Sequence, residues 1–194
     1  MLVSIALAAA LACQFAGCRA APRWRVDLRH AAPLGNPDAP IEVVSFSDFQ
    51  CGWCKRAAAE LRRLQHAHPN RIVLYFKHFP LSYHPHSVDA ARAAEAARLQ
   101  DAFWEMHDLL FAHAHDLHAV GVWTSLAKKA GIDPERFVCE MESDEVRNRV
   151  VADRAEGEAI GVDGTPFFLI NGVPFRGSYS DLSHRLAGPG GGAR

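Results

Sequence analysis

Three short stretches of the chain carry the apolar, β-branched and aromatic residues that are typical of buried strands. Residues 41–47 form the first stretch and residues 71–79 form the second. The third runs from Phe167 to Phe175 and is interrupted by Asn171-Gly172, a pair that favours a tight hairpin turn. Because each stretch is short and bounded by Pro, Gly or Asn, the pattern predicts strands of a buried sheet.

Helical spacing replaces the strand pattern after each of the first two stretches. Directly after the first, apolar residues recur on one helix face at Ala57, Ala58, Leu61 and Leu64, which leaves basic residues for the solvent side. Residues 85–160 are predicted to be almost entirely helical, and Ser180 to Leu186 form a last short helix. The first helix predicted within residues 85–160 is Ser87 to Leu99. It is followed by a segment that Asp101 caps, with Phe103, Met106, His107 and Leu110 on one face, and by Thr124 to Ala130, which ends at Gly131. Asp133-Pro134 then begins a short helix, and Ser143, Asp144 and Glu145 begin a longer one.

The motif Cys51-Gly52-Trp53-Cys54 stands where the first predicted strand is followed by a helix. The first turn of a helix presents unpaired backbone N–H groups and the positive end of the helix dipole, and both favour an anion. A thiol at such a position can have its pKa lowered to roughly 3.5–7.5. We therefore expect Cys51 to be the attacking thiolate and Cys54, one turn further in, to resolve the mixed disulfide. The motif predicts thiol–disulfide exchange.

A C-x-x-C pair also begins many zinc sites, which need two further Cys or His ligands at a short spacing. The chain has no second C-x-x-C motif. Its eleven histidines allow a different metal site, on His84, His86, His113, His115 or His118, or a copper site on the reduced cysteine pair. Of the last three of these histidines, only His115 and His118 share a helix face. We predict no resident metal and keep a periplasmic copper-binding thioredoxin-like protein as the alternative function.

Gly164-Thr165-Pro166 precedes the third predicted strand, and a proline at the first position of a strand is often kept in the cis form. Together with other motifs, it resembles the DsbA-like branch of the thioredoxin-fold thiol–disulfide oxidoreductases. The similarity extends from about residue 35 to residue 187. In chain order, the motifs are residues 35–41, residues 46–54, Phe79-Pro80-Leu81, Phe103-Trp104-Glu105-Met106-His107 and Gly164-Thr165-Pro166.

The resemblance implies an α/β protein with a thioredoxin fold and an inserted helical domain. Residues 36–84 and 161–187 are expected to form the thioredoxin-like domain and residues 85–160 the helical insertion. An extended lead-in at residues 21–35 and a flexible tail at residues 188–194 are expected to flank them. In DsbA-like proteins the insertion packs over the active-site face and forms part of the substrate groove. Trp104 and Phe111 are candidates for that surface, although their helical spacing favours the core.

For the active site, the resemblance implies that Pro166 is cis and lies against the cysteine pair, and that Thr165 offers its backbone to an extended substrate segment. Gly52 and Trp53 are expected to help position the substrate, with Trp53 forming an apolar docking surface. Neither residue carries a charge, whereas groups that stabilise the Cys51 thiolate make the disulfide more oxidising. We therefore expect a less oxidising disulfide than in a protein with histidine in place of Trp53.

The proton relay of Cys54 is where the chain departs from the family pattern. Relatives often have a buried acid six residues before the first cysteine, and here Ser45 stands at that position. Strand periodicity places Ser45 on the same face as Val43, in or near the core. Ser45, acting through a water molecule, and Asp48 are therefore the two candidate proton relays.

Length and charge restrict the choice of partners. A chain of 194 residues is long enough for a hydrophobic core that folds without stabilising disulfide bonds or metal ions. A formal charge of −1 offers no basic surface for nucleic acid. We expect a monomer that acts on cysteine-containing secreted or envelope proteins and is recycled by a redox partner protein. No cofactor is expected, because the electrons pass through the sulfur atoms. Cys139, next to apolar residues in a helical run, is expected to be a buried, inert thiol.

The first 20 residues predict an export signal. Residues 2–12 form an apolar run of the length of a signal peptide's central region, although the basic start is missing and Arg19 is the first basic residue. Phe15-Ala16-Gly17-Cys18 resembles a bacterial lipoprotein cleavage box, so that anchoring through a lipidated Cys18, cleavage near Ala20 and a retained leader all stay open. All three place the domain in the periplasm or another extracytoplasmic space, where disulfide chemistry is productive.

Overall fold

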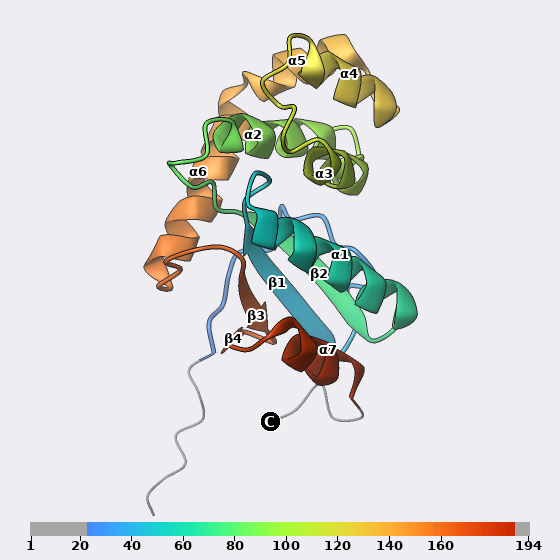
Figure 1. The fold of residues 1–194 in the computed structure, drawn as a ribbon, viewed down its shortest axis with the longest axis vertical. Helices are drawn as coiled ribbons and strands as arrows, with labels where there is room; N and C mark the ends of the chain where they lie inside the picture. The colour runs from blue at the N-terminus through green and yellow to red at the C-terminus, as the bar shows by residue number, and fades with distance from the viewer. Residues whose placement is uncertain (1–22, 189–194) are drawn as a thin grey trace, which may run out of the picture.

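Strand β1 (Ile41–Ser47) lies inside a four-stranded sheet of order β2-β1-β3-β4, and helices pack around it (Figure 1). A computed structural model describes residues 23–188. The other strands are β2 (Ile72–His78), β3 (Phe167–Ile170) and β4 (Val173–Phe175). Strand β2 runs parallel to β1, whereas β3 is antiparallel to both β1 and β4. The protein is thus an α/β protein, as predicted.

Strand β1 is buried on both faces of the sheet because other parts of the chain pack against each face. On one face, α1 (Gly52–Ala67), which connects β1 to β2, packs beside α7 (Tyr179–Ala187) (Figure 1). The core on that face contains Val43, Leu61 and Leu182. On the opposite face, Val44 and Leu169 belong to a separate core. Neighbouring residues of β1 therefore point into different cores, as the alternation of a strand requires.

Five helices follow β2 before the chain returns to the sheet at β3, in the region where the helical insertion is predicted. In Figure 1 the first four of them lie beyond the end of the sheet at which α1 begins. Their hydrophobic core includes Phe103, Met106 and both Cys51 and Cys54, so these helices share a core with the cysteine pair. The helices are α2 (Ser87–Arg98), α3 (Phe103–Ala112), α4 (Val122–Lys129), α5 (Pro134–Met141) and α6 (Asp144–Ala159).

Local signals at the ends of elements agree with the structure in most places. Asp133 and Ser143 cap α5 and α6 with their side chains, as predicted. Asn171 and Gly172 both take left-handed conformations in the turn between β3 and β4, which confirms the predicted hairpin. The prediction that Asp101 caps α3 is wrong: the N-cap is Ala102, and Asp101 has a φ of 59° in the turn before it.

The prediction that Cys139 is buried is also wrong, because its side chain is exposed. Helix α5 turns Phe137 and Met141 into the core. Cys139 lies midway between them in the sequence, about 200° around the helix axis from each. Phe137 and Met141 therefore mark the buried face, and Cys139 lies on the opposite one beside the exposed Val138.

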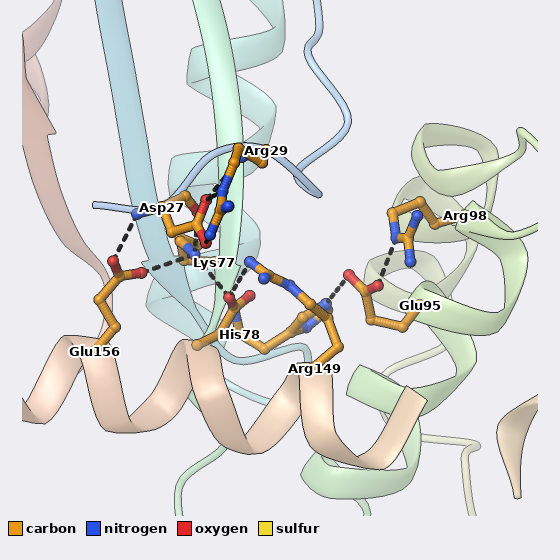
Figure 2. A network of polar contacts seen from close by, with 9 residues as sticks. Asp27, Arg29, Lys77, His78, Glu95, Arg98, Arg149 and Glu156 are labelled. Atoms are coloured by element: carbon orange, nitrogen blue, oxygen red, sulfur yellow. Dashed lines mark hydrogen bonds and ion pairs between the residues drawn. The ribbon is translucent and has the colours of Figure 1, made fainter. Parts of the chain in front are cut away.

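A buried ionic network connects β2 to α6 and to the segment that precedes β1 (Figure 2). Lys77 and Asp153 are only 1% and 2% exposed, and Lys77 Nζ lies 2.7 Å from Asp153 Oδ1 and 2.8 Å from Glu156 Oε2. Lys77 also donates a hydrogen bond to the backbone carbonyl oxygen of Asp27. Because a buried charge is tolerated only when it is paired, these contacts fix α6 and the segment around Asp27 against the sheet.

The predicted leader, with Cys18, and residues 189–194 of the predicted tail lie outside the described residues. Within residues 23–188, the structure contains no helix with the length and apolar character needed to span a membrane.

Candidate active site

Cys51 is the N-cap residue of α1 and follows a tight turn at the end of β1. The Cys51 N–H donates to the backbone carbonyl oxygen of Asp48 at 3.1 Å. The carboxylate of Asp48 is buried and accepts hydrogen bonds from the backbone N–H groups of Gln50 and Leu81, both at 2.7 Å. It also contacts Nδ1 of His84 at 2.9 Å. The side chain of Asp48 is thus fully occupied in holding the turn that presents Cys51.

The two cysteines are free thiols with opposite acidities. Cys51 is 8% exposed and Cys54 is completely buried. Hydrogen bonding from the Cys54 thiol is the largest cause that lowers the pKa of Cys51 to about 5, and the backbone N–H groups of Cys54 and Trp53 add to the effect against the opposing effect of burial. These N–H groups belong to the first turn of α1, as the sequence predicts. Cys51 is therefore a thiolate at neutral pH.

Burial raises the pKa of the Cys54 thiol, and its role as hydrogen-bond donor to Cys51 raises the pKa further. The side chains of Ser47 and Thr165 and the backbone of Asp48 offset only part of this increase. Cys54 is consequently a protonated thiol at neutral pH. A nucleophile in this position must lose its proton before it attacks, and the proton needs a route out of the core.

The loop before β3 brings Thr165 and Pro166 to the cysteine pair. The peptide bond between them is cis, as the resemblance implies. Cys51 Sγ lies 3.6 Å from the carbonyl oxygen of Thr165. The Thr165 hydroxyl is buried, and this side chain favours the thiolate form of both cysteines. Two loops far apart in the sequence thus form one site around the sulfur of Cys51.

An open groove of about 560 Å³ adjoins this site. It is lined by Trp53, Thr165, Pro166, Phe175 and Tyr179, among other residues. Trp53 is 61% exposed, and the Arg56 guanidinium lies 5.0 Å from the centre of its ring. The Tyr179 hydroxyl donates to the backbone carbonyl oxygen of Trp53 at 2.8 Å. Gly52 has open space where a side chain would be, so that the surface beside Cys51 is flat at this residue.

The two predicted relay residues occupy different places. Ser45 is buried and lines a small cavity behind α1, together with Ser47 and His107. The carboxylate of Asp48 is engaged by the turn, and its backbone, rather than its side chain, acts on Cys54. Ser47 is the serine side chain that acts directly on Cys54. The relay roles of Ser45 and Asp48 stay predictions.

Three residues of the site have roles that the sequence analysis does not predict. Ser47 shares a strand face with Ser45 and stands closer to Cys51, so strand periodicity alone was a signal for it. His84 holds Asp48, but in sequence it is only one of many histidines. Tyr179 reaches the site from the last helix, and no local pattern in the sequence indicates its contact with Trp53.

The histidines predicted as alternative metal ligands do not meet in the described part of the chain. Within residues 23–188, no group of three or more His, Cys, Asp or Glu side chains is arranged to hold a metal ion. His113 instead contacts Lys129, and His84 contacts Asp48. The copper-binding alternative stays an untested prediction.

Comparison with known proteins agrees with this fold. Residues 42–182 match the family model of the DSBA-like thioredoxin domain. A thioredoxin-like oxidoreductase from Silicibacter pomeroyi DSS-3 is 32% identical and superposes with a TM-score of 0.66 over 79% of this chain and 88% of that chain. Oxidised BdbD from Bacillus subtilis is 23% identical and has a TM-score of 0.74, covering 86% of this chain and 96% of that chain.

The chain therefore belongs to the DSBA-like thioredoxin domain family. Its fold is the predicted thioredoxin fold with helices inserted between β2 and β3. A protein from Mycolicibacterium gilvum (strain PYR-GCK) named Na(+)/H(+) antiporter NhaA 1 is 36% identical over 155 residues, which make up 77% of this chain and 24% of that protein. The chain thus spans about a quarter of the length of the curated relatives it matches.

Proposed function

We propose that the protein is an extracytoplasmic thiol–disulfide oxidoreductase that exchanges disulfides with cysteine-containing secreted or envelope proteins. The observation that carries this proposal is the opposite acidity of two adjacent thiols, with a thiolate at Cys51 beside Thr165 and a buried thiol at Cys54. A metal site or an inert pair needs no such difference. Thiol–disulfide exchange needs one nucleophile that is ready and a second that is held in reserve.

In the proposed reaction, the Cys51 thiolate attacks a sulfur of a substrate disulfide, and the other substrate sulfur leaves as a thiolate. Cys54 then loses its proton and attacks Cys51 Sγ, so that the Cys51–Cys54 disulfide forms and the substrate is released with two thiols. Two electrons move from the protein to the substrate. The reverse sequence oxidises a substrate dithiol, and a redox partner protein returns the Cys51–Cys54 pair to its starting state.

The groove beside Cys51 supports a substrate that is an extended polypeptide. The Thr165 carbonyl and the Pro166 ring border it near the sulfur, and the exposed Trp53 ring forms an apolar wall. We assign Thr165 and Pro166 to the positioning of the substrate backbone, and Gly52 and Trp53 to the surface that it meets first. The open backbone at Gly52 leaves room for a substrate side chain next to Cys51.

The extracytoplasmic location is supported by the export signal predicted at residues 1–20 and by the need of this chemistry for an oxidising compartment. One similar structure, from Salmonella enterica serovar Typhimurium, is described as a periplasmic thioredoxin-like protein. The relatives named as antiporters support action at the cell envelope, whether the protein is released there or anchored through Cys18. The protein is proposed to act as a monomer without a cofactor.

Exchange of Cys51 for serine tests this function. We expect Cys51→Ser to abolish catalysis of insulin reduction by dithiothreitol and of reduced ribonuclease refolding, because the thiolate is lost. Cys139→Ser is the matched control: it removes an exposed thiol far from the groove and should keep full activity. Cys54→Ser should accumulate mixed disulfides with substrates, visible on non-reducing gels. Full activity of Cys51→Ser would remove the proposed function.

A further inference from the structure

A small cavity lies between β1, β2, α1 and α3, and Ser47 at the end of β1 connects it to the cysteine pair. Its volume is about 20 Å³, and Ser45, Ser47, Trp104 and His107 contribute to its lining. A site of this size is large enough for one water molecule, which needs roughly 10–15 Å³ by the same measure, but not for a larger ligand. The cavity is therefore either dry or the site of a single water.

The polar groups around the cavity favour water. The indole Nε1 of Trp104 is buried and has no hydrogen-bond partner in the described part of the chain. The hydroxyls of Ser45 and Ser47 supply further donors and acceptors on the strand side. A buried N–H without a partner is costly, whereas a water that bonds to Trp104 and to the serines has the two to four partners that an internal water needs.

His107 forms the opposite wall of the cavity and is itself 3% exposed. Its Nδ1 lies 2.8 Å from Oδ1 of Asp108, an exposed residue. Donation from Nδ1 to this carboxylate leaves Nε2 of the neutral ring as a proton acceptor. His107 and Asp108 also line a second, surface cleft of about 330 Å³ between α1 and α3, next to Lys55. His107 thus lines both the inner cavity and the outer cleft, as do Ala58 and Arg62 of α1.

We propose that His107, acting through a water molecule held by Ser45, Ser47 and Trp104, accepts the proton of Cys54 when this thiol attacks and returns the proton when Cys54 leaves. Ser47 connects the cavity to Cys54, because it acts directly on that thiol. The relay takes the place of the buried acid that is missing at Ser45. The inference rests on the proposed function, since only the exchange reaction requires Cys54 to change its protonation state.

The charges around His107 are compatible with a neutral base. Burial lowers the pKa of His107, while Asp108 opposes this change and Arg62 and His78 add to it. Arg62 also pairs with Asp108, and Lys55 borders the outer cleft. A ring that is neutral at physiological pH can accept a proton from Cys54, and Asp108 then stabilises the charged imidazolium.

The balance of the step is simple. The Cys54 S–H bond breaks, its proton passes through the water to His107 Nε2, and the Cys54 thiolate attacks Cys51 Sγ of the mixed disulfide. The Cys51–Cys54 bond forms, the bond from Cys51 to the substrate sulfur breaks, and that sulfur leaves as a thiolate with the electron pair. His107 afterwards releases the proton toward Asp108 and the outer cleft.

The two steps can be followed separately by mixing the reduced Cys139→Ser protein, which lacks the exposed thiol, with the aromatic disulfide 5,5′-dithiobis(2-nitrobenzoic acid) in a stopped-flow instrument. Attack by Cys51 releases the first coloured thiolate at a rate that depends on reagent concentration. Attack by Cys54 releases the second at a rate that does not. We expect His107→Gln to slow only the second phase, by about 10- to 100-fold near neutral pH.

The pH profile of the second phase separates a relay from a structural role. In the wild type its rate should level off above the pKa of His107, whereas in His107→Gln it should keep rising with hydroxide concentration up to about pH 9. Ser47→Ala, which removes only a small buried hydroxyl, should slow the same phase even if His107→Gln folds poorly. His113→Gln, at the end of the same helix, is the control and should change neither phase.

A second phase whose rate and pH profile are unchanged in folded His107→Gln, or in Ser47→Ala, would overturn the relay. An equal slowing of both phases would also contradict it, because a general loss of structure affects Cys51 as well. Failure of the proposed function has a different signature: the wild-type protein would then show no fast first phase, or would show one that survives Cys51→Ser.

Discussion

The Sγ atom of Cys51 lies 3.6 Å from the carbonyl oxygen of Thr165, although 114 positions separate the two residues in sequence. The contact exists because β1 and β3 are neighbours in the sheet and antiparallel, so that the turn after β1 and the loop before β3 leave the sheet at the same end. The Thr165 side chain also lowers the pKa of Cys51, so the acidity of this thiol depends on a loop outside its own helix. The first prediction follows from this dependence.

Thr165→Val removes a hydroxyl and keeps the shape of the side chain. Because the Thr165 side chain favours the thiolate form of Cys51, we expect the pKa of Cys51 to rise in this variant. The pH dependence of Cys51 alkylation by iodoacetamide measures the change. Thr124→Val in α4, at a residue that neither lines the groove nor acts on the Cys51 thiol, should leave the profile unchanged. An unchanged profile in Thr165→Val would mean that Thr165 acts through its backbone alone.

The lowered pKa of Cys51 predicts how the stability of the reduced protein varies with pH. A thiol whose pKa is about 5 in the folded state and near 9 when unfolded contributes stability that is fully present above pH 9 and is lost as the pH falls to 5. Relative to Cys51→Ser, the reduced protein should thus gain free energy of unfolding between these values. Urea denaturation of both proteins at several pH values measures the gain, and parallel curves for the two would contradict it.

The exposed Trp53 ring predicts that a substitution at this residue weakens the binding of protein substrates without slowing the reaction of the Cys51 thiolate. Trp53→Ala removes an apolar wall of the groove without touching the backbone N–H groups that stabilise the Cys51 thiolate. We expect KM for an unfolded protein substrate to increase several-fold, while the rate with a small aromatic disulfide stays the same. Steady-state refolding kinetics give the first quantity and stopped-flow absorbance gives the second. Equal losses in both would place Trp53 in the chemistry instead.

The buried network of Figure 2 predicts a large cost for a single substitution. Lys77→Met leaves Asp153 and Glu156 without their shared cation. We expect a loss of roughly 1–3 kcal/mol in the free energy of unfolding, because the buried carboxylate of Asp153 loses Lys77 and keeps Arg149 as a partner. Arg147→Ala, which breaks an exposed pair with Glu142, should cost less than about 1 kcal/mol. Similar losses for both variants in denaturant titrations would contradict this account.

Local sequence patterns were sufficient to predict the position of the cysteine pair at the start of a helix and the cis proline beside it. The change from strand to helix at Cys51, and the proline at the start of β3, both depend on neighbouring residues and were visible in the sequence. The exposure of Cys139 was predictable in principle, because Phe137 and Met141 already define the buried face of α5. Apolar neighbours along the chain outweighed this spacing in the prediction.

The remaining features depend on contacts between distant segments. Tyr179 meets Trp53, and His84 meets Asp48, only after the sheet and the helices have assembled. The small cavity beside Ser47 combines residues of β1 and α3 that are about 60 positions apart. In sequence, His107 ends a family motif and lies on the buried face of a helix, and neither feature indicates that it lines this cavity. Three-dimensional packing places it there, opposite the serines of β1.

The ultraviolet titration of the Cys51 thiolate tests the central claim most directly. The absorbance at 240 nm of the reduced Cys139→Ser protein, followed from acid to alkaline pH, should show one thiolate that forms with a midpoint near pH 5, and adding Cys51→Ser should remove this transition. Cys54 should contribute no transition below about pH 9, because burial keeps it protonated. A single midpoint between about pH 8 and 9 for both thiols would contradict the account, because neither sulfur would then be a ready nucleophile.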